Sequence, residues 1–563
     1  MESYDWLQLF FFIALTISLT PILGAYMVRV FTGQAVFVQR ILGWLERFCY
    51  QTGGIDPNEE MSWKKYGKAL FLFNFLGFIF LFFLLTVQGY LPLNPQHLGT
   101  VSWALAFNTA ASFTTNTNWQ AYAGETTLSY LTQMLGLTSH NFLSAATGMS
   151  VLLVLIRGLI RKNMKTIGNF WSDLVRMVVY ILLPLSILLS LVLVGEGAVQ
   201  TFSPYIKAAT LEGGEQTIPL GPIASQIAIK QLGTNGGGFF NANSTHPFEN
   251  PTPFSNFLEM LALILIPAAS VYMYGVMVGS RKHAWVLFSA MLALWVVGIV
   301  VSFSSEQIHN PILDAYPLME GKETRIENTA SLLWSVTTTA TANGSVNSML
   351  SSLSPLAGGV ALFNIMLGEL IFGGIGVGLC SMIMMVLLTV FLSGLMVGRT
   401  PEYLGKKIEK NEMQWVVMAI MLPGALILFG TGLSCILPEA LSSLSSQGPH
   451  GLSEILYAFS SAAGNNGSAF AGLNANTTYY NLMLGSVMLL GRVSIILPSL
   501  AIAGLLARKK QTPPTIGTFS TNSLLFFFLL LGVILIVGAL TFFPALSLGP
   551  VAEHLLMLKG QTF

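Results

Sequence analysis

The sequence predicts an all-α polytopic membrane protein with ten transmembrane helices. Four helix–pore-loop–helix repeats surround one central pore in this prediction, with one extra helix at each end of the chain. Three observations carry it: a very low charge content, ten long apolar runs, and four short polar stretches that resemble one another.

Composition places the chain among membrane proteins. Of its 563 residues, 53% are hydrophobic and only 9% are charged, whereas a soluble domain has about 25% charged residues. The net charge of +1 argues against a nucleic-acid partner. Three cysteines without ligand spacing, Cys49, Cys380 and Cys435, indicate neither a disulfide framework nor a zinc site.

Ten apolar runs are long enough to span a bilayer, which requires about 20 residues in a helix. They lie near residues 6–30, 68–91, 134–157, 174–196, 256–279, 284–304, 361–397, 414–436, 482–506 and 522–546. If the loops after the odd-numbered spans are cytoplasmic, they and the adjacent span ends hold 20 of the 26 basic residues, Arg399 among them. By the positive-inside rule, both termini then lie outside.

The chain divides into six units in this prediction. Residues 1–67 are an extra N-terminal helix with a cytoplasmic loop, and residues 511–563 hold the extra C-terminal helix. Between them the four pore repeats occupy residues 68–165, 166–283, 284–410 and 411–510.

Each repeat contains a half-helix that is too short to cross the membrane. The four half-helices lie near residues 102–113, 222–232, 328–340 and 451–463. Each leads into a loop on the outer side, and irregular backbone survives at membrane depth only when buried in protein or lining a water-filled path.

The four loops align on an asparagine. The columns read Asn116, Asn235, Asn343 and Asn466, followed by Thr117, Gly236, Gly344 and Gly467. Glycine permits the dihedral angles that point successive carbonyls at one axis, and potassium filters are rings of such carbonyls. The candidate filter residues are Thr115, Asn116, Thr117, Asn118, Thr234, Asn235, Gly236, Gly237, Ala342, Asn343, Gly344, Ser345, Asn465, Asn466, Gly467 and Ser468.

Any one of these loops alone reads as an ordinary turn, but four in register on one membrane side favour a filter. The half-helices point their C-terminal ends, which carry partial negative charge, toward a cation. The loops contain no acidic ring, so a divalent-cation filter is disfavoured. We expect the asparagine side chains to tie neighbouring loops together instead of touching the ion.

These motifs resemble a known family. TTNTNWQ, GTNGGGFFNANS, TANGSVNS and AGNNGSAF, with GRTPEYLGKKIE after the seventh span, are similar to the potassium-binding, potassium-translocating subunits of bacterial Kdp ATPases. The resemblance covers essentially the whole chain. It implies the fold of the superfamily of potassium transporters, a bacterial cytoplasmic (inner) membrane, and potassium as the transported ion with no further cofactor in this chain. It also implies three partners: a P-type ATPase subunit (KdpB), a single-span subunit (KdpC) and a small membrane peptide (KdpF).

No energy source is visible in the chain. It has neither a G-x-x-x-x-G-K-[ST] loop nor an Asp-Lys-Thr-Gly-Thr phosphorylation sequence. If transport is driven by ATP, then ATP and magnesium bind to another chain, as the resemblance also implies.

The seventh span is unusual because it contains Gly373, Gly374, Gly376 and Gly378. Glycine weakens a helix by about 1 kcal/mol relative to alanine, so a broken helix could form a gate; tight helix packing is the alternative. Glu369, at apolar depth, either guides a cation or pairs with a base.

Arg492 is the only basic residue in the middle of a span. It either pairs with an acid such as Glu369 or supplies a fixed positive charge beside the ion path.

The preferred function is selective binding and translocation of potassium from the outer side, as the channel-like subunit of an ATP-driven uptake pump without a catalytic site of its own. The alternative is a self-sufficient potassium channel or symporter of the same fold. An intramembrane enzyme is disfavoured because the H-E-x-x-H and G-x-S-x-G motifs are missing.

Overall fold

The computed structural model describes residues 3–311, 313, 318–396, 398, 400–511, 513 and 519–561. Arg399, counted above among the inner-side basic residues, lies outside the described residues.

The described residues form ten helical segments that are long and apolar enough to span a membrane, which confirms the predicted number. They are Tyr4–Phe31, Trp63–Tyr90, Thr132–Ile160, Phe170–Glu196, Pro253–Met277, Arg281–Glu306, Val377–Met396, Lys410–Ser434, Thr478–Ala507 and Leu524–Leu558. Eight agree closely with the predicted runs. The seventh begins later than predicted and the tenth ends later.

The elements follow the predicted repeat. Before the first repeat lie α1 (Ser3–Phe31) and α2 (Phe37–Gly53). The first repeat comprises α3 (Trp63–Val87), η1 (Gln88–Tyr90), α4 (Trp103–Thr114), α5 (Gly124–Thr127), η2 (Thr132–Thr138) and α6 (Ser139–Ile160). The second comprises α7 (Phe170–Met177), η3 (Val178–Leu182), α8 (Leu183–Glu196), β1 (Ile206–Ala209), β2 (Glu215–Ile218), α9 (Ile223–Leu232), η4 (Asn243–Thr245) and α10 (Pro253–Met277).

The third repeat comprises α11 (Arg281–Glu306), α12 (Glu327–Ala340), η5 (Leu350–Ser352), α13 (Pro355–Met366), α14 (Val377–Met396), β3 (Glu402–Tyr403) and β4 (Lys406–Lys407). The fourth comprises α15 (Lys410–Ser434), α16 (Pro438–Leu441), α17 (Gly448–Ala463) and α18 (Thr478–Ala507). The chain closes with α19 (Leu524–Leu546), η6 (Ser547–Val551) and α20 (Ala552–Leu558).

The half-helices are α4, α9, α12 and α17. The longest, α17, has 16 residues and is about 24 Å long at 1.5 Å per residue, less than the roughly 30 Å of a bilayer core. Nearly every residue in their C-terminal turns is buried. Each half-helix therefore ends inside the protein, where its loop is shielded from lipid.

The seventh predicted span is divided into two helices. Instead of one helix from residue 361 to 397, α13 ends at Met366 and α14 begins at Val377. Between them Gly368, Glu369, Phe372 and Gly376 have positive φ angles of 75°, 62°, 49° and 76°. Because a right-handed helix cannot contain such residues, the chain is broken here, at the glycine run that the sequence singled out.

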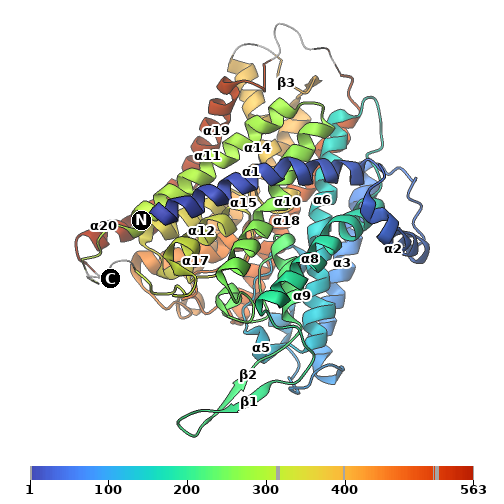
Figure 1. The fold of residues 1–563 in the computed structure, drawn as a ribbon. Coiled ribbons are helices and arrows are strands. Elements are labelled where there is room, and N and C mark those ends of the chain that lie inside the picture. The colour runs from blue at the N-terminus through green and yellow to red at the C-terminus, as the bar shows by residue number, and fades with distance from the viewer. Residues whose placement is uncertain are drawn as a thin grey trace.

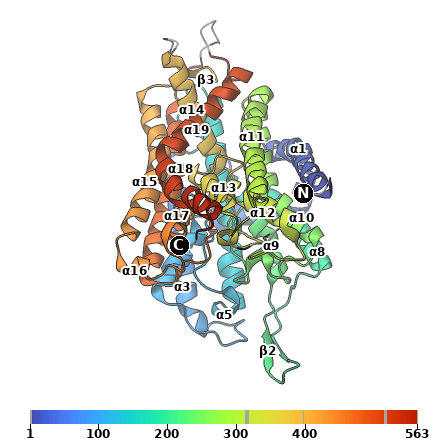
Figure 2. The same ribbon diagram turned by 90° about the vertical axis from the view of Figure 1, so that its left-hand side faces the viewer.

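Two hairpins mark opposite ends of the molecule (Figures 1 and 2). Strands β1 and β2 pair antiparallel after the fourth span, and β3 and β4 do so after the seventh. The buried Lys406 anchors the second hairpin. Its Nζ donates hydrogen bonds to the carbonyls of Gly158 at 2.8 Å, Leu506 at 2.7 Å and Arg161. One ammonium group thus joins the ends of α6 and α18.

Helix α2 lies on the surface and presents a row of exposed apolar side chains: Phe37, Ile41, Trp44 and Phe48. Its opposite face is held by Glu46, which accepts hydrogen bonds from Tyr180 Oη at 2.5 Å and Arg176 Nε at 3.2 Å. Such an amphipathic helix suits the membrane interface.

Candidate ion filter

The four half-helices end in the same way. The residue after each helix donates its N–H to the carbonyl four positions earlier, with distances of 3.1, 2.7, 3.0 and 2.9 Å; these residues are Thr115, Gly233, Thr341 and Gly464. Two positions later, an N–H reaches the carbonyl five positions earlier, with distances of 2.9, 2.9, 3.0 and 2.9 Å; these residues are Thr117, Asn235, Asn343 and Asn466. Backbone hydrogen bonds therefore define one register for all four loops.

This register corrects the alignment on asparagine in the first loop. Thr117, not Asn116, occupies the position of Asn235, Asn343 and Asn466. Asn118 then occupies the glycine position. The first loop contains two asparagines. Aligning the loops on an asparagine gave the wrong register there, because the end of the half-helix cannot be located from the sequence.

The position directly after the helix cap has a left-handed backbone in every loop. Its φ angle is 68° at Asn116, 47° at Thr234, 51° at Ala342 and 50° at Asn465. None of these residues is glycine, although a positive φ is uncommon for other residues and costs about 1–2 kcal/mol. The surrounding protein must therefore hold this conformation in place.

The glycine position is less uniform than expected. The φ angle is 56° at Asn118, 96° at Gly236 and 99° at Gly467, whereas Gly344 has no positive φ. The expectation that glycine supplies a left-handed backbone at Gly344 is therefore wrong. A side chain at Gly344 is excluded for steric reasons instead, because an added Cβ would lie 2.7 Å from the carbonyl oxygen of Asn466.

The loops contact one another in a closed ring. A Cβ on Gly236 would lie 2.3 Å from Gly344 Cα, and one on Gly467 would lie 1.9 Å from the Thr117 carbonyl oxygen. Gly344 in turn lies against Gly467, and Asn116 Nδ2 donates to the Thr234 carbonyl at 3.0 Å. Loops one to four are thus joined in order, and the fourth returns to the first.

The asparagine side chains bind neighbouring loops, as expected. Asn343 Nδ2 donates to the Lys230 carbonyl and Asn466 Nδ2 to the Thr338 carbonyl, both at 3.3 Å. Asn465 Nδ2 donates to Thr117 Oγ1 at 2.9 Å. These amides are occupied as donors within the ring.

Helix α6 supplies residues that the sequence analysis missed. Ser144 Oγ donates to Asn116 Oδ1 at 2.7 Å, and Asn118 Nδ2 donates to Asn141 Oδ1 at 2.5 Å. Two polar residues three positions apart in an apolar span were the available signal, because they lie on one helix face.

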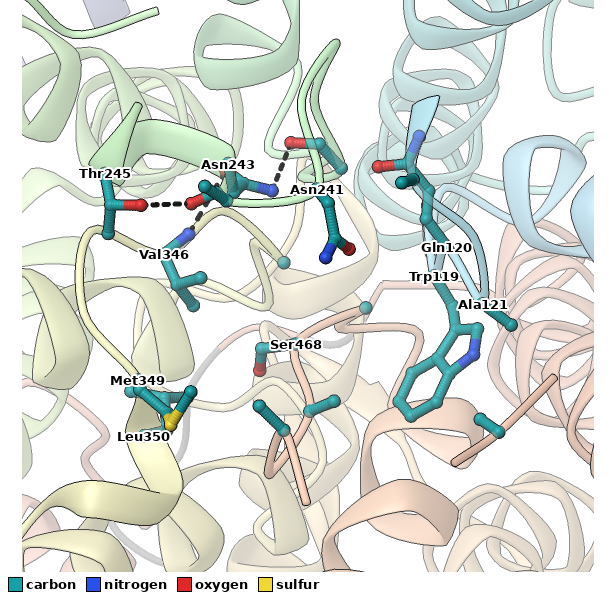
Figure 3. A pocket seen from close by; sticks show the side chains of 18 of the residues that line it. Trp119, Gln120, Ala121, Asn241, Asn243, Thr245, Val346, Met349, Leu350 and Ser468 are labelled. Atoms are coloured by element: carbon teal, nitrogen blue, oxygen red, sulfur yellow. Dashed lines mark hydrogen bonds between the residues drawn. The ribbon is translucent and has the colours of Figure 1, made fainter. Parts of the chain in front are cut away.

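A cavity of about 720 Å³ opens beside the ring, and Figure 3 shows side chains that line it. Residues that follow each of the four loops contribute, among them Trp119, Asn241, Val346 and Ser468. All four loops are therefore reached from one common hollow.

The break in the seventh span lies against the ring. Ile375 N donates to Thr234 Oγ1 at 3.0 Å, and a Cβ on Gly376 would lie 2.2 Å from the Gly148 carbonyl oxygen of α6. Oε2 of the buried Glu369 has no hydrogen-bond partner among the described residues. Gly373, Gly374 and Gly378 are also buried within this segment.

Arg492 lies near this break without forming an ion pair to Glu369 in the described part of the chain. Its Nη2 donates to the Ser144 carbonyl at 3.4 Å. The side chain also lines a cavity of about 310 Å³ together with Thr114 and Thr115 at the end of α4. The other side chains around this cavity are mainly apolar, among them Phe71, Phe107 and Leu489.

Comparisons with known proteins agree across the full chain. The family model described as KdpA, potassium-transporting ATPase A subunit, matches residues 10–555. A protein of Leptospira interrogans named potassium-transporting ATPase potassium-binding subunit is 54% identical over 561 residues, covering 99% of this chain and 100% of the relative. A protein of the same name from Rhodospirillum centenum is 54% identical over 569 residues, covering 100% and 99%.

Among solved structures, the potassium transporter TrkH from Vibrio parahaemolyticus aligns with 88% of this chain and 97% of its own. The TM-score is 0.49 and the sequence identity is 14%.

Proposed function

Because the chain belongs to the family of potassium-transporting ATPase A subunits, we propose that it selectively binds potassium from the outer side and translocates it within an ATP-driven uptake pump. The observation that carries this proposal is the closed ring of four buried loops in one register. A ring of that kind is suited to replacing the hydration shell of a monovalent cation with protein oxygens.

In this proposal the sixteen filter candidates named above provide the ion sites. Their asparagine and threonine side chains hold the ring, and their backbone carbonyls face the ion. Support comes from the neutral character of these residues and from the half-helices, whose C-terminal ends stabilise a cation. The six units named above remain the proposed division of the chain.

The proposed gate is the segment between α13 and α14. Glu369, Gly373, Gly374, Gly376 and Gly378 lie in or beside it, and its contact with Thr234 supports a link to the filter. We assign Arg492 to the ion path as a fixed positive charge. Its burial against the Ser144 carbonyl of α6, without an ion pair to Glu369 in the described residues, supports this role.

ATP hydrolysis belongs to a partner in this proposal. The chain lacks both nucleotide motifs, and the names of its relatives describe a subunit of a transporting ATPase. The partners would be a P-type ATPase subunit (KdpB), which binds ATP and magnesium, a single-span subunit (KdpC) and a small peptide (KdpF). We further propose that the complex lies in the bacterial inner membrane with both termini of this chain outside. The excess of basic residues in the loops after the odd-numbered spans supports this orientation.

The test is purification of the chain from its own membrane, followed by reconstitution. We expect it to copurify with an ATPase whose hydrolysis rises with potassium and about tenfold less with sodium at equal concentration. Potassium flux through the chain alone, without any ATPase, would instead support the self-sufficient channel or symporter.

A further inference from the structure

A fully buried ion pair lies directly behind the second loop. Lys230, in the last turn of α9, places its Nζ 2.6 Å from Glu249 Oε2, and both side chains are 0% exposed. Coulomb attraction often fails to recover the cost of removing such a pair from water. Its presence beside a cation path therefore calls for a role other than stability.

The role of Lys230 can be inferred from the residues at the same position in the other three half-helices. Lys230 lies five residues before the asparagine position, where the other loops carry Ser112, Thr338 and Ser461. Ser112 Oγ donates to the Trp119 carbonyl at 3.0 Å, and Thr338 Oγ1 donates to the Ser345 carbonyl at 2.6 Å.

Trp119 and Ser345 occupy the same place in the register, two residues after Thr117 and Asn343. In the first and third loops, a hydroxyl from the half-helix therefore fixes the carbonyl at this outer position. The fourth loop differs, because Ser461 Oγ accepts a hydrogen bond from Gly467 N at 2.9 Å.

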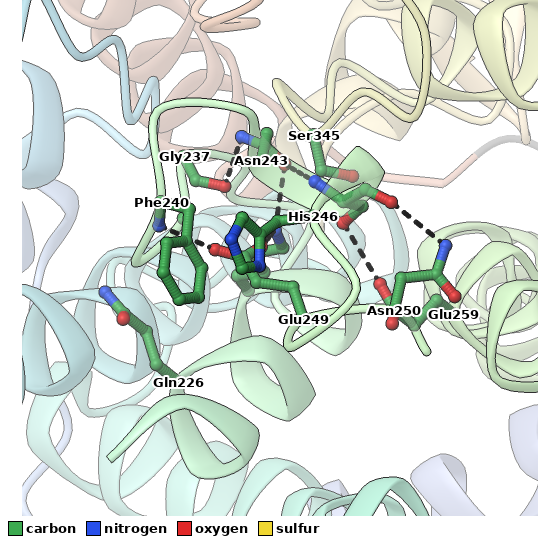
Figure 4. A network of polar contacts seen from close by, with 12 residues as sticks. Gln226, Gly237, Phe240, Asn243, His246, Glu249, Asn250, Glu259 and Ser345 are labelled. Carbon is green, nitrogen blue, oxygen red and sulfur yellow. Dashed lines mark hydrogen bonds and ion pairs between the residues drawn. The ribbon is translucent and has the colours of Figure 1, made fainter. Parts of the chain in front are cut away.

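In the second loop the corresponding carbonyl is that of Gly237, and an asparagine connects it to the lysine. Lys230 Nζ donates to Asn243 Oδ1 at 2.8 Å. Asn243 Nδ2 donates to the Gly237 carbonyl at 2.6 Å, and Figure 4 shows this second bond. Asn243 Oδ1 also accepts from Val346 N at 3.4 Å (Figure 3). One side chain thus joins the outer ends of the second and third loops.

Glu249 completes the arrangement. Its Oε1 accepts a hydrogen bond from Phe240 N at 2.8 Å, and a Cβ on Gly238 would lie 2.7 Å from the same oxygen. The carboxylate therefore supports the backbone that follows the loop. It also balances the lysine charge, which would otherwise repel a cation in the nearby ring.

We propose that Lys230, Asn243 and Glu249 are positioning residues of the potassium filter. Together they replace the hydroxyl of the first and third loops, hold the Gly237 carbonyl at the outer end of the ring, and leave no net charge behind it. This inference rests on the proposed potassium function.

The test compares potassium activation in the assembled complex for Lys230→Met and Asn243→Gly. Glycine adopts the φ of 56° at this position without strain, so the second variant removes the contacts of the Asn243 side chain without straining the backbone. In both variants we expect the half-activating potassium concentration to rise about tenfold, with preference for potassium over sodium reduced and the maximal rate largely kept, as for loss of one charge-linked hydrogen bond.

Asp173→Asn is the matched control. Asp173 forms another buried ion pair, with Arg157 at 2.5 Å, where α6 ends near the β3–β4 hairpin. Thermal stability should fall in this variant while the half-activating concentration and ion preference stay at the wild-type values.

Gly467→Ala separates this inference from the proposed function. If Gly467→Ala weakens potassium selection while Lys230→Met and Asn243→Gly retain wild-type values, the positioning role is wrong. If Gly467→Ala also changes nothing, the filter itself is wrong. Should Lys230→Met fail to assemble, Asn243→Gly alone decides between these outcomes.

Discussion

Substitution by alanine, which adds one methyl group, should affect glycines of the ring differently from glycines elsewhere in the chain. Gly467 and Gly213 both have positive φ angles, 99° and 81°, so alanine strains the backbone at either place. Of the two, only Gly467 would bring the new Cβ into collision with another loop, since a Cβ on Gly213 would have no described atom within 4 Å.

Gly467→Ala should therefore raise the half-activating potassium concentration by about tenfold to a hundredfold, because the overpacked loop shifts its neighbours at a cost of about 1–3 kcal/mol. Gly213→Ala should leave it unchanged. Potassium-dependent ATPase curves of the assembled complexes measure both. If the two variants gave the same ATPase curve, the fourth loop would not be part of the potassium filter.

Arg492 is expected to act on the ion through its charge. A unit charge about 10 Å away at an effective dielectric constant of about 20 contributes about 1–2 kcal/mol. Arg492→Met should therefore assemble and shift the half-activating potassium concentration about tenfold, whereas Arg492→Lys should retain most of the wild-type value. Potassium titration of ATPase activity gives the comparison. A complex that is unstable as Arg492→Met and is restored by adding Glu369→Gln would instead reveal a structural pair.

The four loops could be located from the sequence, but their register could not. The small polar loops stand out against the apolar spans, and the sixteen filter candidates were chosen from them. Which asparagine of the first loop corresponds to Asn235 depends on where α4 stops, and that is decided by hydrogen bonds to Ser112. The sequence does not single out Lys230, because its burial depends on a pair with Glu249, 19 residues later.

At the scale of the element, the broken seventh span is the proposed gate. An alanine at Gly376 would have its Cβ 2.2 Å from the Gly148 carbonyl oxygen, so the segment could no longer pack on α6 as it does. We expect Gly376→Ala to slow transport about tenfold or more while potassium binding changes little, since rigid packing resists such an insertion.

Gly432→Ala in α15 is the control, because none of the residues that the structure describes has an atom within 4 Å of its added Cβ. Ion uptake into vesicles and equilibrium potassium binding, measured on the same preparations, separate the two effects. Binding that falls in parallel with transport in Gly376→Ala would identify the segment as packing instead of a gate.

The break was foreseeable as a weakness, but its limits were not. Four glycines in six residues predict an unstable helix. Near its C-terminal end the irregular segment contacts Thr234 and Gly148, which belong to the second and first repeats. Apolar character continues through the break, so hydropathy alone extended the span to residue 361.

For the whole molecule, the C-terminal segment is fastened to the fourth half-helix by a pH-sensitive contact. His450 Nδ1 lies 2.9 Å from Glu553 Oε1, and Glu454 is 4.0 Å from the other ring nitrogen. The hydrogen bond to Glu553 raises the pKa of His450 above its usual 6.5, against the opposing effect of burial.

A raised pKa in the folded state stabilises the protein fully below pH 6.5, and that contribution is lost as the pH rises through the folded value. The midpoint temperature of thermal unfolding should therefore decrease as the pH is raised from about 6 to about 8. His450→Gln should lower the midpoint at the acidic end and flatten the profile. A wild-type slope that persists in this variant would assign the pH dependence to other groups.

The ring of loops also has a consequence for biosynthesis. Its closing contact joins Asn465 to Thr117 across 348 residues, so a ribosome must complete more than four-fifths of the polypeptide before the first loop meets its last neighbour. Until then the first three loops form only part of the ring. A filter of the proposed kind therefore cannot be completed in a nascent chain before the fourth repeat has been synthesised.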